Sequence, residues 1–479
     1  MKYSKETKFE ELSIAIPIAL DTLLQDHLIR KDKQEDVAFA LYKPSHGLIR
    51  FSALIHQIIL PEEEERNVHG NVEISSKYFK RACMMAAKEK SGIVLLHSHT
   101  GPGWQGMSMD DFSSERSYAS TVETITGLPF VGLTLATDRV WSGRFWEEQN
   151  GWYERRWAAT VRVVGKHLKV SFHDGLRPEP AFREIYKRTA TVWGMANHGQ
   201  LARLRIGIVG LGSVGSIVAE SLARMGVERL LLLDFDEVQL HNLDRLLGAT
   251  ESDVGLSKVL IAHRQILKSA TAANPQIKAV ISAVTEEDGY RNVLDCDLLF
   301  SCVDRPWPRQ IQNHIAYNHL IPVIDGGIQV RFDPKTRIFK GADWQAQVVG
   351  PERPCLQCLK VFNPSDVGTE KAGLLDDPTY LEGLPVDHGF KRNENIFPYS
   401  MNLASLEVMQ FIEMVTGIAD TFYYGTQRYT YNQGFIRTHD QLRCEDGCLY
   451  QGSIALGDSA IPPSIGLDHS AEKARKRQS

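Results

Sequence analysis

The order of hydrophobic and polar positions divides the chain into two regions, each with alternating predicted strands and helices. Apolar periodicity in the first region predicts these elements: a helix over about 12–30, strands over about 36–42 and 48–60, a helix over about 75–89, and strands at 93–96, 130–136 and 139–146. An acidic run at 61–66 interrupts the pattern and marks a solvated loop. The first region is therefore predicted to be an α/β domain over residues 1–160.

The pattern changes after Arg177-Pro178-Glu179-Pro180, and we place a linker at 161–180. From Arg205 onward an apolar strand, a glycine-rich turn, a helix and a second apolar strand follow one another. This order is typical of a doubly wound, Rossmann-like parallel sheet. We therefore expect a second α/β domain over 181–460, followed by a flexible basic tail at 461–479.

Two histidines after the buried strand at 93–96 suggest a metal site. His97 and His99 are two residues apart, so their side chains point the same way on an extended segment. A carboxylate from the following helix would complete a three-ligand zinc site with one position open for water. Glu35, at the start of an upstream strand, is the candidate base for that water. The alternative is that the histidines end a strand and the carboxylates cap a helix.

Together with the later run Ser108-Met109-Asp110-Asp111, this arrangement resembles the JAMM (JAB, MPN+) metalloproteases over about residues 10–155. Members of that family hydrolyse the bond after the C-terminal glycine of ubiquitin-like proteins. The resemblance implies that His97, His99 and Asp111 bind zinc. It also implies that Glu35 activates water and that the Ser108 hydroxyl stabilises the oxyanion.

The spacing departs from the family pattern at one point. Eight residues separate His99 from Ser108, whereas the family has seven, so a strict count selects Met107 and Asp110. We prefer Ser108 and Asp111, because this choice places an apolar residue directly after the ligand.

A glycine-rich turn opens the second domain. Gly210, Gly212 and Gly215 form G-x-G-x-x-G between a strand at 205–209 and a helix. Glycines let the backbone approach a phosphate at a helix N-terminus, where free N–H groups favour anions. The next strand ends at Asp234, where a carboxylate can bind a ribose hydroxyl. By itself this pattern suggests a nicotinamide or flavin dinucleotide.

The polar residues that follow favour ATP instead. Asn242, Arg245 and Lys258 come after the run Asp234-Phe235-Asp236, and Asp304 ends a later buried strand. Displacement at the α-phosphate of ATP needs clustered donors and positive charges, which a redox dinucleotide does not. The Asp304 carboxylate is well placed to hold magnesium.

These residues closely resemble the adenylyltransferases of the ubiquitin-activating superfamily, which includes thiamine- and molybdopterin-synthesis enzymes, over about Phe182 to Leu456. The resemblance implies a cofactor-binding set with Asp234 and Asp236 near the ribose, Asn242, Arg245 and Lys258 at the phosphates, and Asp304 at the metal. Arg188 matches an arginine that superfamily dimers insert into the neighbouring ATP site, which implies a homodimer. The implied reaction adenylates the C-terminal carboxylate of a small ubiquitin-like protein. The alternative is a domain that kept the fold and lost ATP chemistry.

Seven cysteines exclude a fully paired disulfide framework. Four of them form two short pairs, Cys355 with Cys358 and Cys444 with Cys448, which predict a closed structural zinc site; the alternative is reduced thiols. The other three (Cys83, Cys296 and Cys302) lie among apolar neighbours, and none falls at 359–400, where related activating enzymes carry a thioester cysteine. We therefore expect inert thiols, with an oxyester on Ser365 or Thr369 as a weaker hypothesis.

The chain has 479 residues and a net charge of −5. It has no apolar run near the roughly 18 residues that span a bilayer and no signal-peptide pattern, so we expect a cytoplasmic protein that binds neither membrane nor nucleic acid. Two activities directed at one modifier tail predict a bifunctional enzyme of a bacterial ubiquitin-like conjugation pathway. The combination of the two domains resembles fusions encoded in prokaryotic operons that also carry a modifier and a conjugating enzyme, many of them linked to antiviral defence. This resemblance implies a conjugating enzyme as partner. The alternatives are a sulfur-carrier activator and a scaffold without turnover.

Overall fold

The computed structural model describes residues 9–69, 71–181, 183–333, 335–336, 338–384, 394–419, 425–460 and 465–478. The chain divides into two compact units. The first unit runs to Glu179 and includes the short segments 318–320 and 453–461, and the second contains the remaining residues from Pro180.

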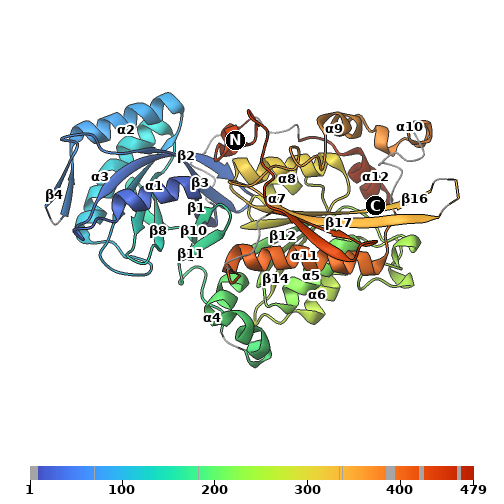
Figure 1. Ribbon diagram of the computed structural model, residues 1–479. Coiled ribbons are helices and arrows are strands. Elements are labelled where there is room, and N and C mark those ends of the chain that lie inside the picture. The colour runs from blue at the N-terminus through green and yellow to red at the C-terminus, as the bar shows by residue number, and fades with distance from the viewer. Residues whose placement is uncertain are drawn as a thin grey trace. The chain divides into compact units, whose positions relative to one another are not determined.

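The first unit is built on a nine-stranded mixed sheet with strand order β11-β10-β1-β3-β2-β6-β7-β8-β9 (Figure 1). Its strands are β1 Glu11–Pro17, β2 Val37–His46, β3 Arg50–Ile59, β6 Gly92–Ser98, β7 Phe130–Leu135, β8 Trp141–Gln149, β9 Trp152–Trp157, β10 Thr160–Val164 and β11 Leu168–Phe172. Its helices are α1 Ile18–Leu28, α2 Ser76–Glu89 and α3 Met109–Thr126, and β4 Arg66–His69 pairs with β5 Asn71–Ile74.

Helices cover both faces of this sheet, and strand β2 shows how. Its alternate residues Ala38 and Ala40 face a core that includes Leu24 of α1. The intervening residue Phe39 faces a second core with Ala82 of α2. Because successive side chains of a strand point to opposite faces, a continuous apolar run is buried on both sides.

The structure differs from the expected elements of the first region in two places. Residues 11–17 are strand rather than helix, because β1 pairs in parallel with β3 and β10 and buries Leu12, Ile14 and Ile16 at a spacing of two. The expected linker at 161–180 contains most of β10 and all of β11, which complete the same sheet. The first unit therefore extends beyond residue 160.

The second unit contains an eight-stranded sheet with order β14-β13-β12-β15-β16-β17-β18-β19. Its strands are β12 Arg205–Val209, β13 Arg229–Leu233, β14 Gln276–Val280, β15 Leu298–Ser301, β16 Val323–Phe332, β17 Phe339–Val349, β18 Thr426–Thr430 and β19 Phe435–His439. Its helices are α4 Lys187–Arg203, α5 Ser213–Arg224, α6 Lys258–Ser269, α7 Glu287–Val293, α8 Pro306–Asn318, α9 Pro364–Lys371, α10 Pro378–Gly383, α11 Phe397–Thr416 and α12 His469–Gln478.

The first five strands of this sheet, from β14 to β16, are parallel, and the last three pairings are antiparallel. Helices α5, α6 and α11 lie on one side of the sheet and α7 and α8 on the other (Figure 1). The unit is therefore a Rossmann-like α/β domain. In such sheets ligands bind beyond the carboxyl ends of the parallel strands, and the loops after β12, β13 and β15 carry the predicted site residues.

The expected flexible tail contains an ordered helix instead. Residues 461–464 and 479 of that tail lie outside the described residues. Helix α12 buries Ala471 and Ala474, and Arg475 forms an ion pair with Glu286 at 2.7 Å. Basic composition alone predicts solvation, but two alanines spaced three residues apart give this helix a small apolar face that can pack.

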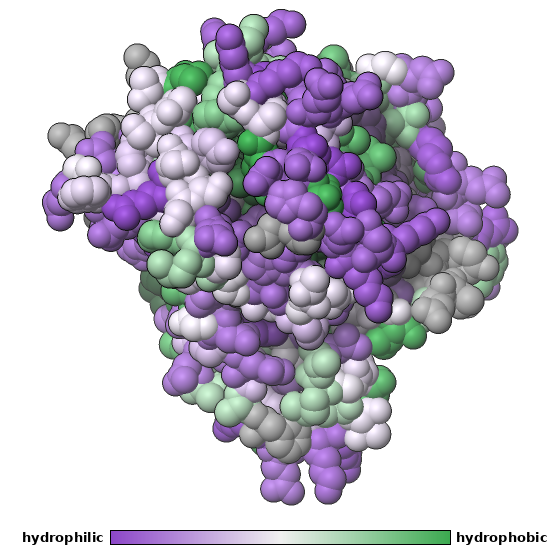
Figure 2. All heavy atoms as spheres, turned by 90° about the vertical axis from the view of Figure 1, so that its left-hand side faces the viewer, coloured by the Kyte–Doolittle hydropathy of each residue, from purple (hydrophilic) through white to green (hydrophobic). Residues whose placement is uncertain are grey.

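Every helix among the described residues is too short or too polar to cross a membrane. The face drawn in Figure 2 is dominated by hydrophilic residues, with hydrophobic ones scattered between them. Single exposed apolar residues of this kind are ordinary on protein surfaces.

Candidate functional site

The glycine-rich turn joins β12 to α5, and its backbone packs closely against neighbouring backbone atoms. Gly210 has φ +88°, and a Cβ there would lie 2.6 Å from the Cys302 carbonyl oxygen. A Cβ on Gly215 would lie 1.9 Å from the Gly210 carbonyl oxygen. Gly212 caps α5 and has open space around it. Two glycines thus allow the turn to close, while the third leaves room in front of the helix N-terminus, where free N–H groups favour an anion.

Asp234 directly follows β13 and is hydrogen-bonded to the glycine turn. Its carboxylate accepts hydrogen bonds from the N–H groups of Leu211 at 2.6 Å and Asp236 at 2.7 Å. Burial raises the pKa of Asp234 to about 6, although the charge of Lys258 lowers it. Lys258 donates to Asp236 at 2.8 Å; burial alone would lower the pKa of Lys258, but Asp234 and Asp236 raise it. These carboxylates and the ammonium group form one linked set.

A cavity of about 1150 Å³ opens beyond these strands. Most of the predicted cofactor-binding set lines it, namely Gly210, Gly212, Asp234, Asp236, Asn242, Arg245, Lys258 and Asp304. Arg245 donates to the His241 carbonyl at 2.6 Å and to Asp244 at 2.8 Å, and the Asn242 side chain accepts from the Gln239 N–H at 3.0 Å. Gly215 packs behind the turn, and Arg188 is exposed on α4 and does not line this cavity.

The cavity also contains residues that the sequence analysis did not select. Asp325, after the buried residues Val323 and Ile324, is fully buried and accepts from Ser301 at 2.8 Å, Gln347 at 2.7 Å and Arg309 at 3.2 Å. In the sequence, Asp325 stands directly after the apolar run 320–324 and before Gly326-Gly327, and this position was the available signal. Lys473 and Arg477 of α12 line the cavity too, and nothing local in the sequence indicates this.

In the first unit, His97, His99 and Asp111 come together at the end of β6 and the start of α3. Their ligand atoms all lie within 4.8 Å of one another. The Asp111 carboxylate is 3.6 Å from His97 Nε2 and 3.3 Å from His99 Nε2, and the two Nε2 atoms are 3.1 Å apart. Asp111 rather than Asp110 is the carboxylate of this cluster. Two imidazoles and one carboxylate at such spacing fit a three-ligand zinc site.

Ser108 and Glu35 flank the cluster in different ways. Ser108 caps α3, where its hydroxyl accepts from the Asp111 N–H at 3.0 Å and its N–H donates to the Asp111 carboxylate at 3.0 Å. This reciprocal cap fixes Asp111 toward the histidines. Glu35 is half-buried; burial raises its pKa, and the charges of His99 and Asp111 also act on it. The carboxyl group therefore lies within electrostatic reach of the cluster.

A buried ionic network lies behind His97. Arg144 donates to Glu115 through Nε at 2.9 Å and through Nη2, and Trp146 Nε1 donates to the same carboxylate at 2.7 Å. Another Arg144 nitrogen donates to Thr134 Oγ1 at 2.7 Å, and that hydroxyl lies 3.3 Å from His97 Nε2. Burial, with the charge of Arg144, lowers the pKa of His97 to about 3, so the imidazole is neutral, as a metal ligand must be.

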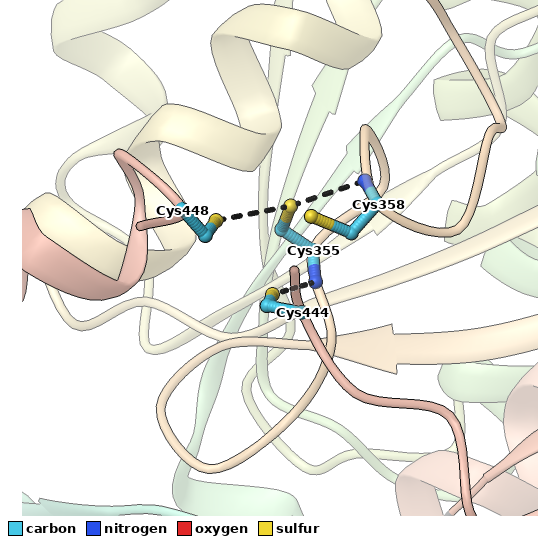
Figure 3. Close-up of side chains that lie close together, drawn as sticks. All are labelled: Cys355, Cys358, Cys444 and Cys448. Atoms are coloured by element: carbon cyan, nitrogen blue, oxygen red, sulfur yellow. Dashed lines mark hydrogen bonds between the residues drawn. The ribbon is translucent and has the colours of Figure 1, made fainter. Parts of the chain in front are cut away.

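The four paired cysteines meet in the second unit (Figure 3). Cys355 Sγ lies 3.7 Å from Cys448 Sγ, the Cys355 N–H donates to Cys444 Sγ at 3.2 Å, and the Cys358 N–H donates to Cys355 Sγ at 3.3 Å. With Zn–S bonds of about 2.3 Å, tetrahedral sulfurs lie roughly 3.8 Å apart. The cluster therefore fits a structural zinc ion that ties residues 355–358 to residues 444–448.

The three remaining cysteines are poor nucleophiles. Cys296 is fully buried, and burial raises the pKa of Cys83. Cys302 lines the cavity, but burial and the nearby Glu407 and Asp325 raise its pKa well above the ordinary value. A thiol held protonated does not attack an adenylate.

Known proteins resemble parts of this chain. Ubiquitin-like modifier-activating enzyme 5 of Drosophila willistoni is 33% identical over 137 residues, which cover 26% of this chain and 32% of the relative. tRNA threonylcarbamoyladenosine dehydratase 2 of Saccharomyces cerevisiae is 28% identical, with 44% and 47% covered. Molybdopterin-synthase adenylyltransferase of Escherichia coli is 29% identical, with 40% and 73% covered. The chain thus spans less than half the length of the first two relatives.

Among solved structures, E. coli MccB with MccA-N7isoASN matches 57% of this chain and 76% of its own, at 18% identity and a TM-score of 0.43. The ThiF family model matches residues 186–446, which is more than half of the chain and includes the glycine turn, the cavity residues from Asp234 to Asp304 and three of the paired cysteines. The chain belongs to the ThiF family.

Proposed function

We propose that this protein is an ATP-dependent adenylyltransferase that activates the C-terminal carboxylate of a small ubiquitin-like protein. The observation that carries the proposal is the cavity of about 1150 Å³, whose wall combines a glycine-lined helix N-terminus with Asp234, Arg245, Lys258 and Asp304. The names of two relatives, a modifier-activating enzyme and an adenylyltransferase, support the same chemistry.

In the proposed reaction, a carboxylate oxygen of the modifier attacks the α-phosphorus of ATP, the bond to the bridging oxygen of the β-phosphate breaks, and pyrophosphate leaves. Asp234 accepts a hydrogen bond from the ribose, and the N-terminus of α5 faces phosphate. Arg245 and Lys258 neutralise charge that develops on the phosphates. Magnesium, when bound at Asp304, would neutralise the charge of the leaving pyrophosphate.

Modifier-dependent exchange of labelled pyrophosphate into ATP tests the proposal. Small ubiquitin-like and sulfur-carrier proteins with C-terminal glycines serve as candidate substrates. Asp304→Ala should abolish exchange without changing the melting temperature, whereas Asp26→Ala, exposed on α1, is the matched control and should exchange at the wild-type rate. Full exchange in Asp304→Ala would contradict the assigned role.

The product mass separates modifier conjugation from sulfur transfer. A covalent modifier–target conjugate supports conjugation with a conjugating enzyme, whereas a thiocarboxylate at the modifier C-terminus supports a sulfur-carrier activator. The name of one relative, molybdopterin-synthase adenylyltransferase, supports testing for the thiocarboxylate as well. A chain with neither ATP exchange nor peptide cleavage would be a binding scaffold.

The proposal includes a homodimer in which Arg188 reaches the nucleotide cavity of the neighbouring copy. Arg188 is exposed on α4 and does not line the cavity of its own chain. Light scattering of the purified protein measures the oligomeric state. A dimer whose Arg188→Ala variant stays dimeric but loses exchange supports this role, and a monomer with full exchange contradicts it.

We propose a second activity, zinc-dependent hydrolysis of the bond after the modifier C-terminus, because His97, His99 and Asp111 converge and the charges of the last two act on the half-buried Glu35. These three side chains would hold the ion, and Glu35 would take a proton from the attacking water. Zinc, when bound, would polarise the scissile carbonyl as a Lewis acid. Ser108 is fixed at the start of α3 and would donate to the developing oxyanion.

Zinc content and cleavage of a linear modifier fusion test the second activity together. His97→Ala should lose both one zinc equivalent and cleavage, whereas Glu35→Gln should keep zinc and lose cleavage. Glu62→Gln, an exposed carboxylate of the same unit, is the control and should retain both. Cleavage by Glu35→Gln at the wild-type rate would exclude Glu35 as the base.

A further inference from the structure

Helix α12 lies along one wall of the nucleotide cavity, outside the region that the ThiF model matches. The start of the helix is linked by hydrogen bonds to Arg305, the residue after Asp304. Ser470 donates to Asp376, and Asp376 in turn accepts from Arg305 at 2.8 Å. Near the other end of the helix, Arg477 lies 4.0 Å from Glu237, the residue after Asp236. The helix therefore runs from the predicted magnesium side to the predicted ribose side.

The helix has three distinct faces. Ala471 and Ala474 are fully buried and form the packing face. Glu472 and Lys476 pair with each other at 2.8 Å, and the Lys476 side chain is 72% exposed, so they form an outer face. Ser470, Lys473 and Arg477 all line the cavity and are spaced at i, i+3 and i+7, which places them on one side of a helix.

Several contacts hold α12 in this place. Thr285 donates to Asp468 at 2.8 Å, the Gly466 N–H donates to the Thr285 carbonyl at 3.0 Å, and both Arg475 terminal nitrogens bind Glu286 at 2.7 Å. Burial alone would raise the pKa of Asp376, but the hydrogen bond from Ser470 and the charges of Arg305 and Lys473 lower it. Lys473 is thus close to the Asp376–Arg305 pair.

Lys473 and Arg477 are less closely paired with carboxylates than other positive side chains that line the cavity. Lys258, Arg305, Arg309 and Arg428 are each matched by a carboxylate, respectively Asp236, Asp376, Asp325 and Asp343. Lys473 is exposed and forms no ion pair within 4.0 Å with any residue that the structure describes. Arg477 has only the long 4.0 Å contact with Glu237. Anionic phosphates entering the cavity would meet two weakly compensated positive charges.

We propose that α12 is a wall of the nucleotide site and that Lys473 and Arg477 bind the negatively charged phosphates of a nucleoside triphosphate in this cavity. The inference rests on the proposed adenylation function, since it concerns the same site. It assigns a binding role to a C-terminal segment whose sequence reads as a solvated tail.

Calorimetric titration of the full chain with Mg-ATP and, separately, with adenosine tests this proposal. Lys473→Ala/Arg477→Ala should raise the Kd for ATP at least about tenfold, which is about 1.4 kcal/mol, because the variant loses two charge-assisted contacts to the phosphates. Adenosine carries no phosphate, so its Kd should change less than about twofold. The control Lys268→Ala/Lys476→Ala removes two exposed positive charges that do not line the cavity, and its Kd for ATP should match the wild type.

The outcomes distinguish this inference from the function on which it rests. A wild-type chain that binds no ATP overturns both. A wild-type chain that binds ATP, with a double variant of unchanged ATP affinity, overturns only the role of α12. Equal weakening for ATP and adenosine also overturns it, because the helix would then act through folding rather than through phosphate binding.

Discussion

Replacement of Glu115 by glutamine should destabilise the first unit strongly. Glu115 and Arg144 are 1% and 0% exposed, and the carboxylate accepts hydrogen bonds from Arg144 and from Trp146 Nε1. Glutamine keeps the shape and one acceptor for Trp146 but removes the negative charge. Arg144 would then be a buried cation without a compensating charge, since its remaining contact is to the neutral Thr134 hydroxyl at 2.7 Å.

The expected loss is about 3–5 kcal/mol, the usual cost of breaking a fully buried ion pair by removing one partner. Domains have a free energy of unfolding of about 5–15 kcal/mol, so this loss is a large share of the total. At about 1.4 kcal/mol per factor of ten, backbone amides that exchange only through unfolding of the unit should exchange at least about a hundredfold faster.

Hydrogen exchange measured by mass spectrometry on peptides from β6 and β8 follows the first unit separately from the rest of the chain. Glu73→Gln is the matched control, because its ion pair with His69 joins side chains that are 72% and 50% exposed and such pairs contribute about 0–1 kcal/mol. The double variant Glu115→Gln/Arg144→Met also removes the uncompensated positive charge of Arg144, so it should recover part of the lost free energy of unfolding. Exchange in Glu115→Gln within about threefold of the wild type would refute the reasoning.

Three further predictions concern the second unit. Gly215→Ala should lower the melting temperature and weaken ATP binding, because its Cβ would lie 1.9 Å from a carbonyl oxygen, whereas Gly212→Ala, with open space around its Cβ, should melt like the wild type; equal melting of both variants would contradict this. Burial raises the pKa of Asp234 to about 6, so its contribution to stability is greatest below about 3.8 and declines up to about 6. Denaturant unfolding between pH 4 and 7 should therefore show Asp234→Asn gaining stability relative to the wild type as pH rises, and a constant difference would contradict it. Cys444→Ser should remove one zinc equivalent measured by elemental analysis and speed exchange at 355–358, whereas Cys83→Ser should leave zinc unchanged; full zinc in Cys444→Ser would count against the site.

Local patterns of the sequence predicted the parts of the sites that lie on one turn or strand end. The spacing of Gly210, Gly212 and Gly215 depends on backbone geometry within a few residues, and it predicted the turn between β12 and α5. The preference for Asp111 over Asp110 agrees with the clustered carboxylate, because a capping serine three residues earlier fixes the direction of Asp111. Such features depend on backbone geometry and hydrogen bonds between residues close in sequence, so they produce a recognisable sequence pattern.

Long-range pairing and packing were decided only by the tertiary structure. Residues 11–17 form a strand because β3 and β10 lie on either side of it. Residues 161–164 and 168–172 of the expected linker also join this sheet by pairing, so neither assignment follows from its own sequence. The Arg144–Glu115 pair joins α3 to β8, and α12 reaches a cavity formed mostly by residues far earlier in the chain. The sequence by itself determined which chemical groups were available, whereas tertiary packing brought distant groups together, because burial and charge compensation depend on neighbours in space.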